Sequence, residues 1–179
     1  PFYGPKLDIQ YKNVYGKEDT LVTIQIDMLL AERFGMYYTD ENGEKKLPYI
    51  IHRTSLGCYE RTLAYLIEHY AGALPTWMAP EQVRFLPVTD RAVDYCKEQA
   101  AKLTAQGYRV TVDTRSEKIG KKIRDAQTEK IPYMLVVGDR DIEAGTVSPR
   151  HRADGDLGAM TLDAFTAVLK DVVDNKLQK

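Results

Sequence analysis

The sequence predicts an α/β protein in two parts: an antiparallel sheet that carries one helix, then a compact α/β domain with a mostly parallel or mixed sheet. Three observations favour this. Short strand patterns separated by polar turns fill the first part, and strand and helix patterns alternate after residue 80. Between them, residues 71–80 contain two prolines and a glycine, which break a helix. We therefore expect two domains, residues 1–76 and 77–179.

The first part begins with two predicted strands, 7–14 and 21–28. Apolar and polar residues alternate in both, and the polar segment 15–19 between them is typical of a turn. A loop with an Asn-Gly turn signal follows at 40–46. Three or four strands give only a thin core, so we expect this part to be the tail of a larger domain.

Residues 47–70 are predicted to form a short buried strand, a tight turn at Gly57 and an amphipathic helix. His52 would end the strand. On the helix, the 3/4 spacing predicts one inward face, formed by Tyr59, Leu63, Leu66, Ile67 and Tyr70. Arg61 lies about 200° around the helix from Tyr59, so we expect it to point away from the core, on the side of Tyr65 and Glu68.

The second part alternates strands and helices. The predicted strands are 83–88, 108–113 and 133–137, and the predicted helices are 90–105, 117–130 and 161–175. Asp90 and Thr161 are expected to cap the first and the last of these helices. The apolar strand 133–137 is expected to be central, and segment 139–152 to be a polar hairpin or loop-strand. The last helix should turn five residues inward, namely Leu162, Phe165, Val168, Leu169 and Val172.

Composition excludes several classes of protein. The net charge of −1 over 179 residues does not indicate a general nucleic-acid binder. The two cysteines, Cys58 and Cys96, lack metal-type spacing and predict no disulfide framework, so a reducing cytosol is expected. No apolar run reaches the roughly 18 residues of a membrane helix, so we expect no membrane association.

Two residues of the strand–turn–helix stretch could carry chemistry. His52 could be a metal ligand, although a lone histidine at a strand end is also commonly structural. Arg61, near a helix start, could bind a phosphate or stack on a base, but the pattern alone favours an ion pair with Glu60 or Glu68. Gly57 would let another group approach the backbone closely.

Polar residues of the first strands form a second candidate. Lys6 could anchor a carboxylate or a phosphate. Thr23 and Gln25 are two positions apart, so they face the same side of the sheet and could recognise a small polar ligand. The polar outer face of an ordinary antiparallel strand would have the same pattern.

A basic stripe in the second part suits a nucleic-acid backbone, although a solvated helix face has the same appearance. It consists of Arg115, Lys118, Lys121, Lys122, Arg124 and Lys130, interrupted by Asp125 and Glu129. The next polar segment holds Arg140, Asp141 and Arg150, whose mixed charges could contact base edges as well as phosphates.

Longer stretches of the sequence closely resemble threonyl-tRNA synthetases, and the resemblance covers essentially the whole chain. The stretches are Phe-Tyr-Gly-Pro-Lys-Leu-Asp (2–8), Thr-Ile-Gln-Ile-Asp (23–27), Ile-His-Arg-Thr-Ser-Leu-Gly-Cys-Tyr-Glu-Arg (51–61), and segments 66–80, 117–124 and 132–139. The resemblance implies the end of a class II catalytic sheet followed by an anticodon-binding domain.

The resemblance also implies roles for single residues. In the catalytic part, Arg61 would contact ATP phosphates or the nucleotide, with Gly57 and Thr20 nearby, and ATP would arrive with Mg²⁺. Tyr3, Lys6, Thr23 and Gln25 match positions around threonine and the adenylate, and His52 resembles one ligand of a catalytic zinc that holds threonine and rejects valine. In the second domain, five residues fall where family members meet the anticodon loop: Ser116, Lys130, Arg140, Asp141 and Arg150.

Two departures from the family pattern affect these roles. Asp19-Thr-Leu-Val stands where many members have Trp-Gln-Cys-Gly, which puts the contact at Thr20 in doubt. Ser116, Lys130 and Asp141 replace an Asn, an Arg and a Glu of some members. The family's first two signature motifs, its other zinc ligands and its editing region all precede the matched segment.

We therefore expect the C-terminal part of a cytoplasmic, homodimeric threonine–tRNA ligase, which would bind tRNA but lack activity alone. The alternative is a non-enzymatic tRNA- or RNA-binding module, which would need neither His52 nor Arg61. A synthetase for proline, glycine or histidine is a third possibility, and the combination of Tyr3, Lys6, Gln25 and His52 argues against it.

Overall fold

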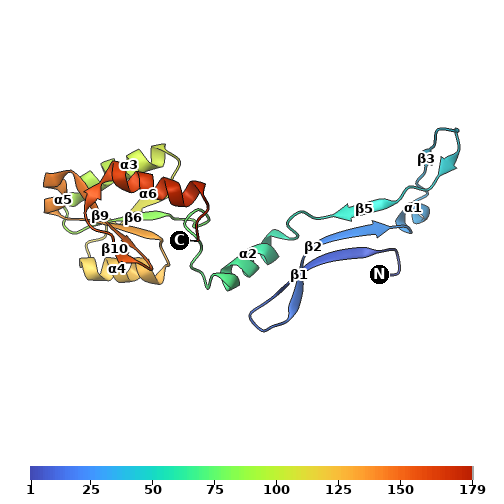
Figure 1. Ribbon diagram of the computed structural model, residues 1–179, viewed down its shortest axis with the longest axis horizontal. Helices are drawn as coiled ribbons and strands as arrows, with labels where there is room; N and C mark the ends of the chain where they lie inside the picture. Colours follow the sequence, from blue (N-terminus) through green and yellow to red (C-terminus); the bar gives the residue numbers. More distant parts are fainter. Residues whose placement is uncertain (179) are drawn as a thin grey trace. The chain divides into compact units, whose positions relative to one another are not determined.

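A computed structural model describes residues 1–178 and divides them into two compact units, unit 1 from Pro1 to His69 and unit 2 from Tyr70 onward. Both units have antiparallel strand pairs, and the sheet of unit 2 is mixed, which confirms the predicted fold class (Figure 1). None of the helices in the described part combines the length and apolar character needed to cross a membrane.

Unit 1 is built on a three-stranded antiparallel sheet in the order β1-β2-β5. The strands are β1 (Lys6–Lys12), β2 (Glu18–Asp27) and β5 (Ile50–Arg53), and the helix α2 (Tyr59–His69) follows them. All four elements were predicted from the sequence, but β5 was expected to be buried, and three of its four residues are exposed. Two small features were missed: the one-turn helix α1 (Leu30–Arg33) and the hairpin of β3 (Tyr38–Thr39) and β4 (Lys45–Lys46) around the expected loop.

Helix α2 does not bury the face that its apolar spacing predicts. Tyr59, Leu63 and Ile67 are 80%, 53% and 48% exposed, so this expectation is wrong within this chain. The side of Tyr65 faces the sheet instead, and the Tyr65 ring packs against Tyr11 with 4.3 Å between ring centroids. A sheet of three short strands has too little surface to cover this apolar face of the helix.

Unit 2 is a mixed sheet with helices on both faces. Its strand order is β10-β9-β8-β6-β7, with β11 also paired to β9. The strands are β6 (Val83–Pro87), β7 (Val110–Val112), β8 (Tyr133–Val137), β9 (Thr146–His151), β10 (Gly155–Asp156) and β11 (Met160–Thr161). Strands β7, β6 and β8 are parallel, and β9 runs antiparallel to β8.

The helices of unit 2 are α3 (Ala92–Ala105), α4 (Ile119–Thr128), α5 (Asp139–Ala144) and α6 (Leu162–Asp174). Helices α3 and α6 cover one face of the sheet and α4 the other (Figure 1). The central strand β8 serves both cores: Leu135 and Val137 pack towards α3 and α6, and Met134 packs towards α4. This confirms the sequence-based placement of 133–137 as a buried central strand.

Of the four local predictions for unit 2, the cap of α6 is confirmed and the other three need correction. Thr161 caps α6 as predicted, with its Oγ1 accepting a hydrogen bond from the Ala164 amide at 3.2 Å. Asp90 makes no capping bond to α3, because the helix starts later and its N-cap is Arg91. Val168 is 40% exposed rather than inward. Segment 139–152 ends in a strand, β9, as the loop-strand alternative expected, but it begins with the helix α5 and not with a loop.

Candidate functional site

Three predicted site residues form one row across the sheet of unit 1. Lys6 on β1 lies opposite Gln25 on β2, and Gln25 lies opposite His52 on β5. Directly opposed residues of antiparallel strands point to the same face. Asp8 and Thr23 form the next row on that face. We call this face of β2 and its neighbours, from Thr20 to Asp27, the polar strip.

The segment before β1 contributes Tyr3 to the polar strip. The Tyr3 hydroxyl donates to Gln25 Oε1 at 2.8 Å, and Gln25 Nε2 donates to Thr23 Oγ1 at 3.3 Å. Gly4 makes this approach possible, since a Cβ on it would lie 2.0 Å from the Ile26 carbonyl oxygen. The strip therefore presents a connected chain of phenol, amide and hydroxyl groups.

Lys6 is paired with a carboxylate that sequence reasoning did not select. Its Nζ lies 2.7 Å from Asp8 Oδ2, which also accepts from the Thr20 hydroxyl at 3.5 Å. The hydrogen bond to Asp8 raises the pKa of Lys6, and the same bond lowers the pKa of Asp8. The signal was available, because residues two apart on a strand share a face.

His52 lies beside another carboxylate. Its Nε2 is 3.4 Å from Oδ2 of the buried Asp27, whose Oδ1 accepts from the amides of Leu29 and Leu30. The Leu30 amide is the main cause that lowers the pKa of Asp27, and His52 adds to it. Zinc usually takes at least three protein ligands, and residues 1–178 contain no group of three candidate ligands. The residues present therefore do not form a zinc site by themselves.

Arg61 and Gly57 lie at the other end of β2. Arg61 Nη1 donates to the Thr20 carbonyl at 2.9 Å. Gly57 has a φ of +69°, and a Cβ on it would lie 2.1 Å from the Leu21 carbonyl oxygen. The group that approaches this glycine within the chain is thus the β2 backbone.

The structure does not bring His52 and Arg61 together in one small space. His52 pairs with Gln25 and Arg61 contacts Thr20, five positions earlier on β2. At the rise of an extended strand, five residues span about 16 Å. The two side chains mark opposite ends of the polar strip, and Tyr3, Lys6, Thr23 and Gln25 lie between them.

In unit 2, Ser116 lines a pocket at the carboxyl ends of β6 and β7. The pocket has a volume of about 350 Å³, and we call it the carboxyl-end pocket. Its lining consists of Val88, Thr89, Asp90, Arg115, Ser116, Glu117, Lys118 and Lys122. The ends of parallel strands commonly form ligand sites, because the loops that follow the strands converge there.

Arg140 and Asp141 lie in the first turn of α5, just beyond the carboxyl end of β8. The Asp141 carboxylate is held by its own chain: Oδ2 accepts from the Gly138 amide at 2.9 Å, and Oδ1 accepts from the Ser148 hydroxyl at 2.9 Å. Arg140 is exposed. Asp141 therefore ties α5 to the polar side of β9 as well as presenting a charge.

Lys130 and Arg150 lie towards the amino end of β8. Arg150 is opposite Met134 on the α4 side of the sheet, and its Nη1 is 3.4 Å from Asp156 Oδ2. Lys130 follows α4 with a φ of +62°. The five predicted anticodon residues thus divide into two groups. Ser116, Arg140 and Asp141 lie beyond the carboxyl ends of the parallel strands, and Lys130 and Arg150 lie towards the amino end of β8.

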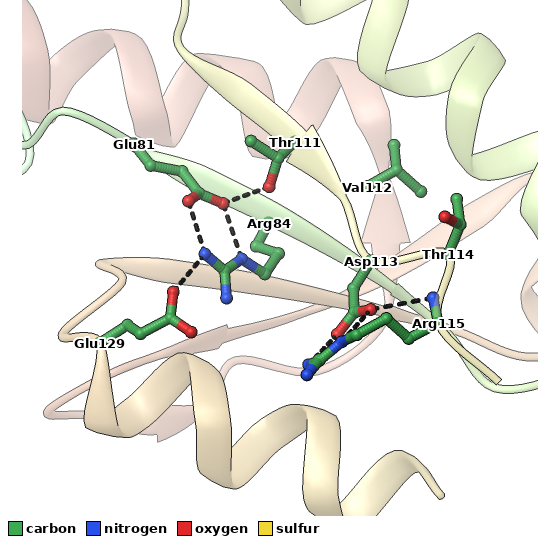
Figure 2. Close-up of a pocket in the computed structure, with 8 residues that line it drawn as sticks. All are labelled: Glu81, Arg84, Thr111, Val112, Asp113, Thr114, Arg115 and Glu129. Carbon is green, nitrogen blue, oxygen red and sulfur yellow. Dashed lines mark hydrogen bonds and ion pairs between the residues drawn. The ribbon is translucent and has the colours of Figure 1, made fainter. Parts of the chain in front are cut away.

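A second hollow, of about 310 Å³, lies beside β7, and ion-paired side chains line it (Figure 2). Arg84 is held between Glu81 and Glu129, each at 2.6 Å. Arg115 pairs with Asp113 at 2.7 Å and with Asp125 at 2.9 Å. These ion pairs join the strand segments to α4, through Glu129 at its end and Asp125 within it.

The structure corrects the predicted basic stripe. Arg115 is committed to two carboxylates, Lys121 pairs with Glu117 at 2.5 Å, and Lys122 is buried. The solvent-facing stripe was therefore wrong for Lys122. Among the residues that the structure describes, Lys118, Arg124 and Lys130 form no ion pair.

Comparison with known proteins matches both units to families. The family described as "tRNA synthetase class II core domain (G, H, P, S and T)" matches residues 1–70, and the "Anticodon binding domain" family matches residues 82–172. Together, the two matches assign the chain to the class II aminoacyl-tRNA synthetases. Within that class, the chain belongs to the threonyl-tRNA synthetase family.

Individual relatives support this. The threonine–tRNA ligase of Clostridium perfringens strain 13 is 63% identical over 92% of the chain, and that of Clostridium botulinum strain Eklund 17B is 57% identical over 98%. The chain spans only 26% and 27% of their lengths. A crystal structure of the RNA binding domain of threonyl-tRNA synthetase from Cryptosporidium parvum Iowa II is 34% identical, with a TM-score of 0.80, and covers 96% of this chain and 44% of its own.

Proposed function

We propose that the chain is the C-terminal part of an enzyme that activates threonine with ATP and transfers it to its tRNA, and that unit 2 contacts the anticodon. The proposal includes the division of the chain into a catalytic part, residues 1–76, and an anticodon-binding domain, residues 77–179. The observation that supports it most is the polar strip, where Tyr3, Lys6 and Gln25 lie on one face of the paired strands β1 and β2 within a class II core segment. The chain then continues into an anticodon-binding domain.

The polar strip has the length and chemistry for an amino acid joined to a nucleotide. Tyr3, Thr23 and Gln25 would hydrogen-bond the amino acid, and Lys6 would place a positive charge near its carboxylate. At the other end of the strip, Arg61 would contact the phosphates or the nucleotide, beside Thr20 and Gly57. Thr20 lies about 16 Å along β2 from Gln25. ATP with its Mg²⁺ would be the second substrate.

His52 would supply one ligand of the zinc that the family resemblance implies. When bound, such a metal acts as a Lewis acid that can hold the amino and hydroxyl groups of threonine. The other ligands would have to come from outside the 179 residues, since no three-ligand group occurs in the described part. Asp27 would keep its contact with His52 Nε2, at 3.4 Å, and so orient the imidazole that binds the metal.

On unit 2, the anticodon loop would lie over the α4 side of the sheet. Ser116 and Asp141 offer oxygen acceptors, and Arg140, Lys130 and Arg150 offer donors at both edges. An extended loop of several nucleotides is needed to reach both groups, because β8 separates them. Phosphate contacts would supply affinity, and contacts to base edges would supply specificity.

We also propose that the complete enzyme is a cytoplasmic homodimer. The likeness to threonyl-tRNA synthetases supports this, and the exposed apolar side chains of unit 1, among them Leu7, Ile9 and Ile51, leave a surface for further contacts.

The anticodon role is tested by binding the 179-residue chain to a labelled RNA hairpin with a threonine anticodon and to the same hairpin with a scrambled loop. We expect tighter binding of the first, and a log K that falls with log salt by about 0.7 per phosphate contact, the value for single strands. Arg150→Ala should reduce the preference, and Lys97→Ala, on the opposite helix layer, should not. Equal binding of both hairpins by the unaltered chain would contradict the anticodon role.

The enzymatic role is tested by threonine-dependent ATP–pyrophosphate exchange. We expect none from the isolated chain, and measurable exchange would overturn that expectation. In the full-length protein, His52→Ala and Arg61→Ala should each abolish threonine activation. Unchanged activation with weakened RNA binding would instead favour the non-enzymatic RNA-binding module.

A further inference from the structure

Lys122 is a buried lysine at the base of the carboxyl-end pocket. Its residue surface is 4% exposed, whereas the neighbouring Lys121 faces solvent. Lys122 Nζ donates to two main-chain carbonyl oxygens, those of Pro87 and Asp113, each at 3.1 Å. A charged side chain is rarely buried without such partners, so the burial of Lys122 depends on these two carbonyl oxygens.

The two carbonyls mark the point where β6 and β7 separate. The last bond between the two strand ends runs from the Asp113 amide to the Phe85 carbonyl at 2.9 Å. Beyond it, the chain leaves the sheet in two loops, 88–90 and 113–118, which line the pocket. Lys122 Nζ bonds to both chain segments at the points where they leave the sheet. It therefore joins β6 and β7 beyond the last hydrogen bond between the two strands.

The side chains around Lys122 are held in place as well. The Asp113 carboxylate accepts from Arg115 Nε at 2.9 Å and from Arg115 Nη2 at 2.7 Å, and Lys122 adds to the positive charge facing it. Cys96 from α3 also lies near the lysine charge. Ser116 follows directly on this network, three positions after Asp113.

We propose that Lys122 is a positioning residue for RNA recognition: by tying the ends of β6 and β7 it fixes loop 113–118, and with it the presentation of Ser116 to the anticodon loop. This rests on the proposed function of unit 2. Lys122 acts through the loop, because its ammonium group is buried, whereas the exposed Lys121 is paired with Glu117 and touches neither loop carbonyl.

The test compares Lys122→Met with Lys121→Met in the full 179-residue chain. Methionine keeps the length of the stem but removes the donors. Two readouts are measured: amide hydrogen exchange of segments 88–90 and 113–118, and binding of the threonine-anticodon and scrambled hairpins at several salt concentrations. Lys122→Gln, which retains a donor, serves as the second variant, and carries the test if the methionine variant does not fold.

We expect Lys122→Met to raise exchange in both segments and to reduce the preference between hairpins by about tenfold, with an unchanged salt slope. Lys122→Gln should fall between this variant and the unaltered chain, and Lys121→Met should leave exchange and preference unchanged.

Unchanged exchange and preference in Lys122→Met would overturn the proposal, and a salt slope reduced by about one unit with equal weakening of both hairpins would show a phosphate contact instead. If the unaltered chain does not distinguish the hairpins, the anticodon role fails, and the exchange measurement still decides whether Lys122 holds the loops.

Discussion

Lys121 and Lys122 are neighbours in the sequence but occupy opposite environments in the fold. One faces solvent and pairs with Glu117, and the other is buried against two carbonyls. A helix turns about 100° per residue, so adjacent lysines need not share a face. A count of basic residues cannot separate these roles, whereas burial and hydrogen-bond partners do.

Asp113 gives a pH-dependent prediction at the same scale. The residue is 8% exposed, and hydrogen bonds from Arg115 lower the pKa of its carboxyl group. A lowered pKa means that the stabilisation is present above the ordinary carboxyl pKa of about 4 and is lost as the pH falls below it. Asp113→Asn should therefore destabilise unit 2 by roughly 1–3 kcal/mol at pH 7, and by less at pH 3.5.

Urea unfolding followed by tryptophan fluorescence measures this effect, because the single tryptophan, Trp77, lies in unit 2. Asp94→Asn is the matched control, since the Asp94 side chain is 96% exposed. An equal loss at both pH values would show that the Arg115 pair does not depend on the charge of Asp113.

At the scale of elements, the junction between β5 and α2 depends on a backbone conformation. Gly57 combines a positive φ with close approach to β2, whereas Gly16 has a φ of +76° and no atom within 4 Å of its Cβ position. Gly57→Ala should displace the turn and break the Arg61–Thr20 contact. Gly16→Ala should cost only the backbone strain, about 1 kcal/mol.

Hydrogen exchange of segment 54–62, compared between the two variants, measures the displacement. The Thr62 amide, bonded to the Cys58 carbonyl at 3.1 Å, is a suitable probe of the first helical turn. Equal protection in both variants would mean that the chain tolerates a side chain at position 57.

At the scale of the whole molecule, the two units differ in how much they bury. Unit 2 has two apolar clusters, one under α3 and α6 and one under α4. In unit 1, among its described residues, Asp27 and Ala31 are the buried ones. Burial of apolar surface is the main source of stability, so the units should differ in stability by several kcal/mol.

We therefore expect limited proteolysis of the full chain to cut within residues 1–69 first and to leave a resistant fragment that contains unit 2. Mass spectrometry of the fragments identifies the cut sites, and tryptophan fluorescence reports whether unit 2 stays folded. Simultaneous loss of both units would show that they unfold as one cooperative body.

Much of the fold could be predicted because local patterns were strong. The alternation in β1 and β2, the apolar run of β8 and the cap at Thr161 each indicate one conformation. The short helices α1 and α5 were missed because four and six residues are too few to show a helical periodicity. The face of α2 was wrong because periodicity shows where apolar residues lie, but not whether this chain supplies anything to cover them.

The sequence by itself determined whether most segments form a helix or a strand. It also indicated the family, because the family motifs are runs of consecutive residues. It also placed Thr23 and Gln25 on one face, because a strand repeats every two residues. Only the tertiary structure decided which strands pair, and hence that Lys6, Gln25 and His52 form one row and that Lys122 joins two strand ends. Such contacts link residues that are distant along the chain, and no local pattern contains them.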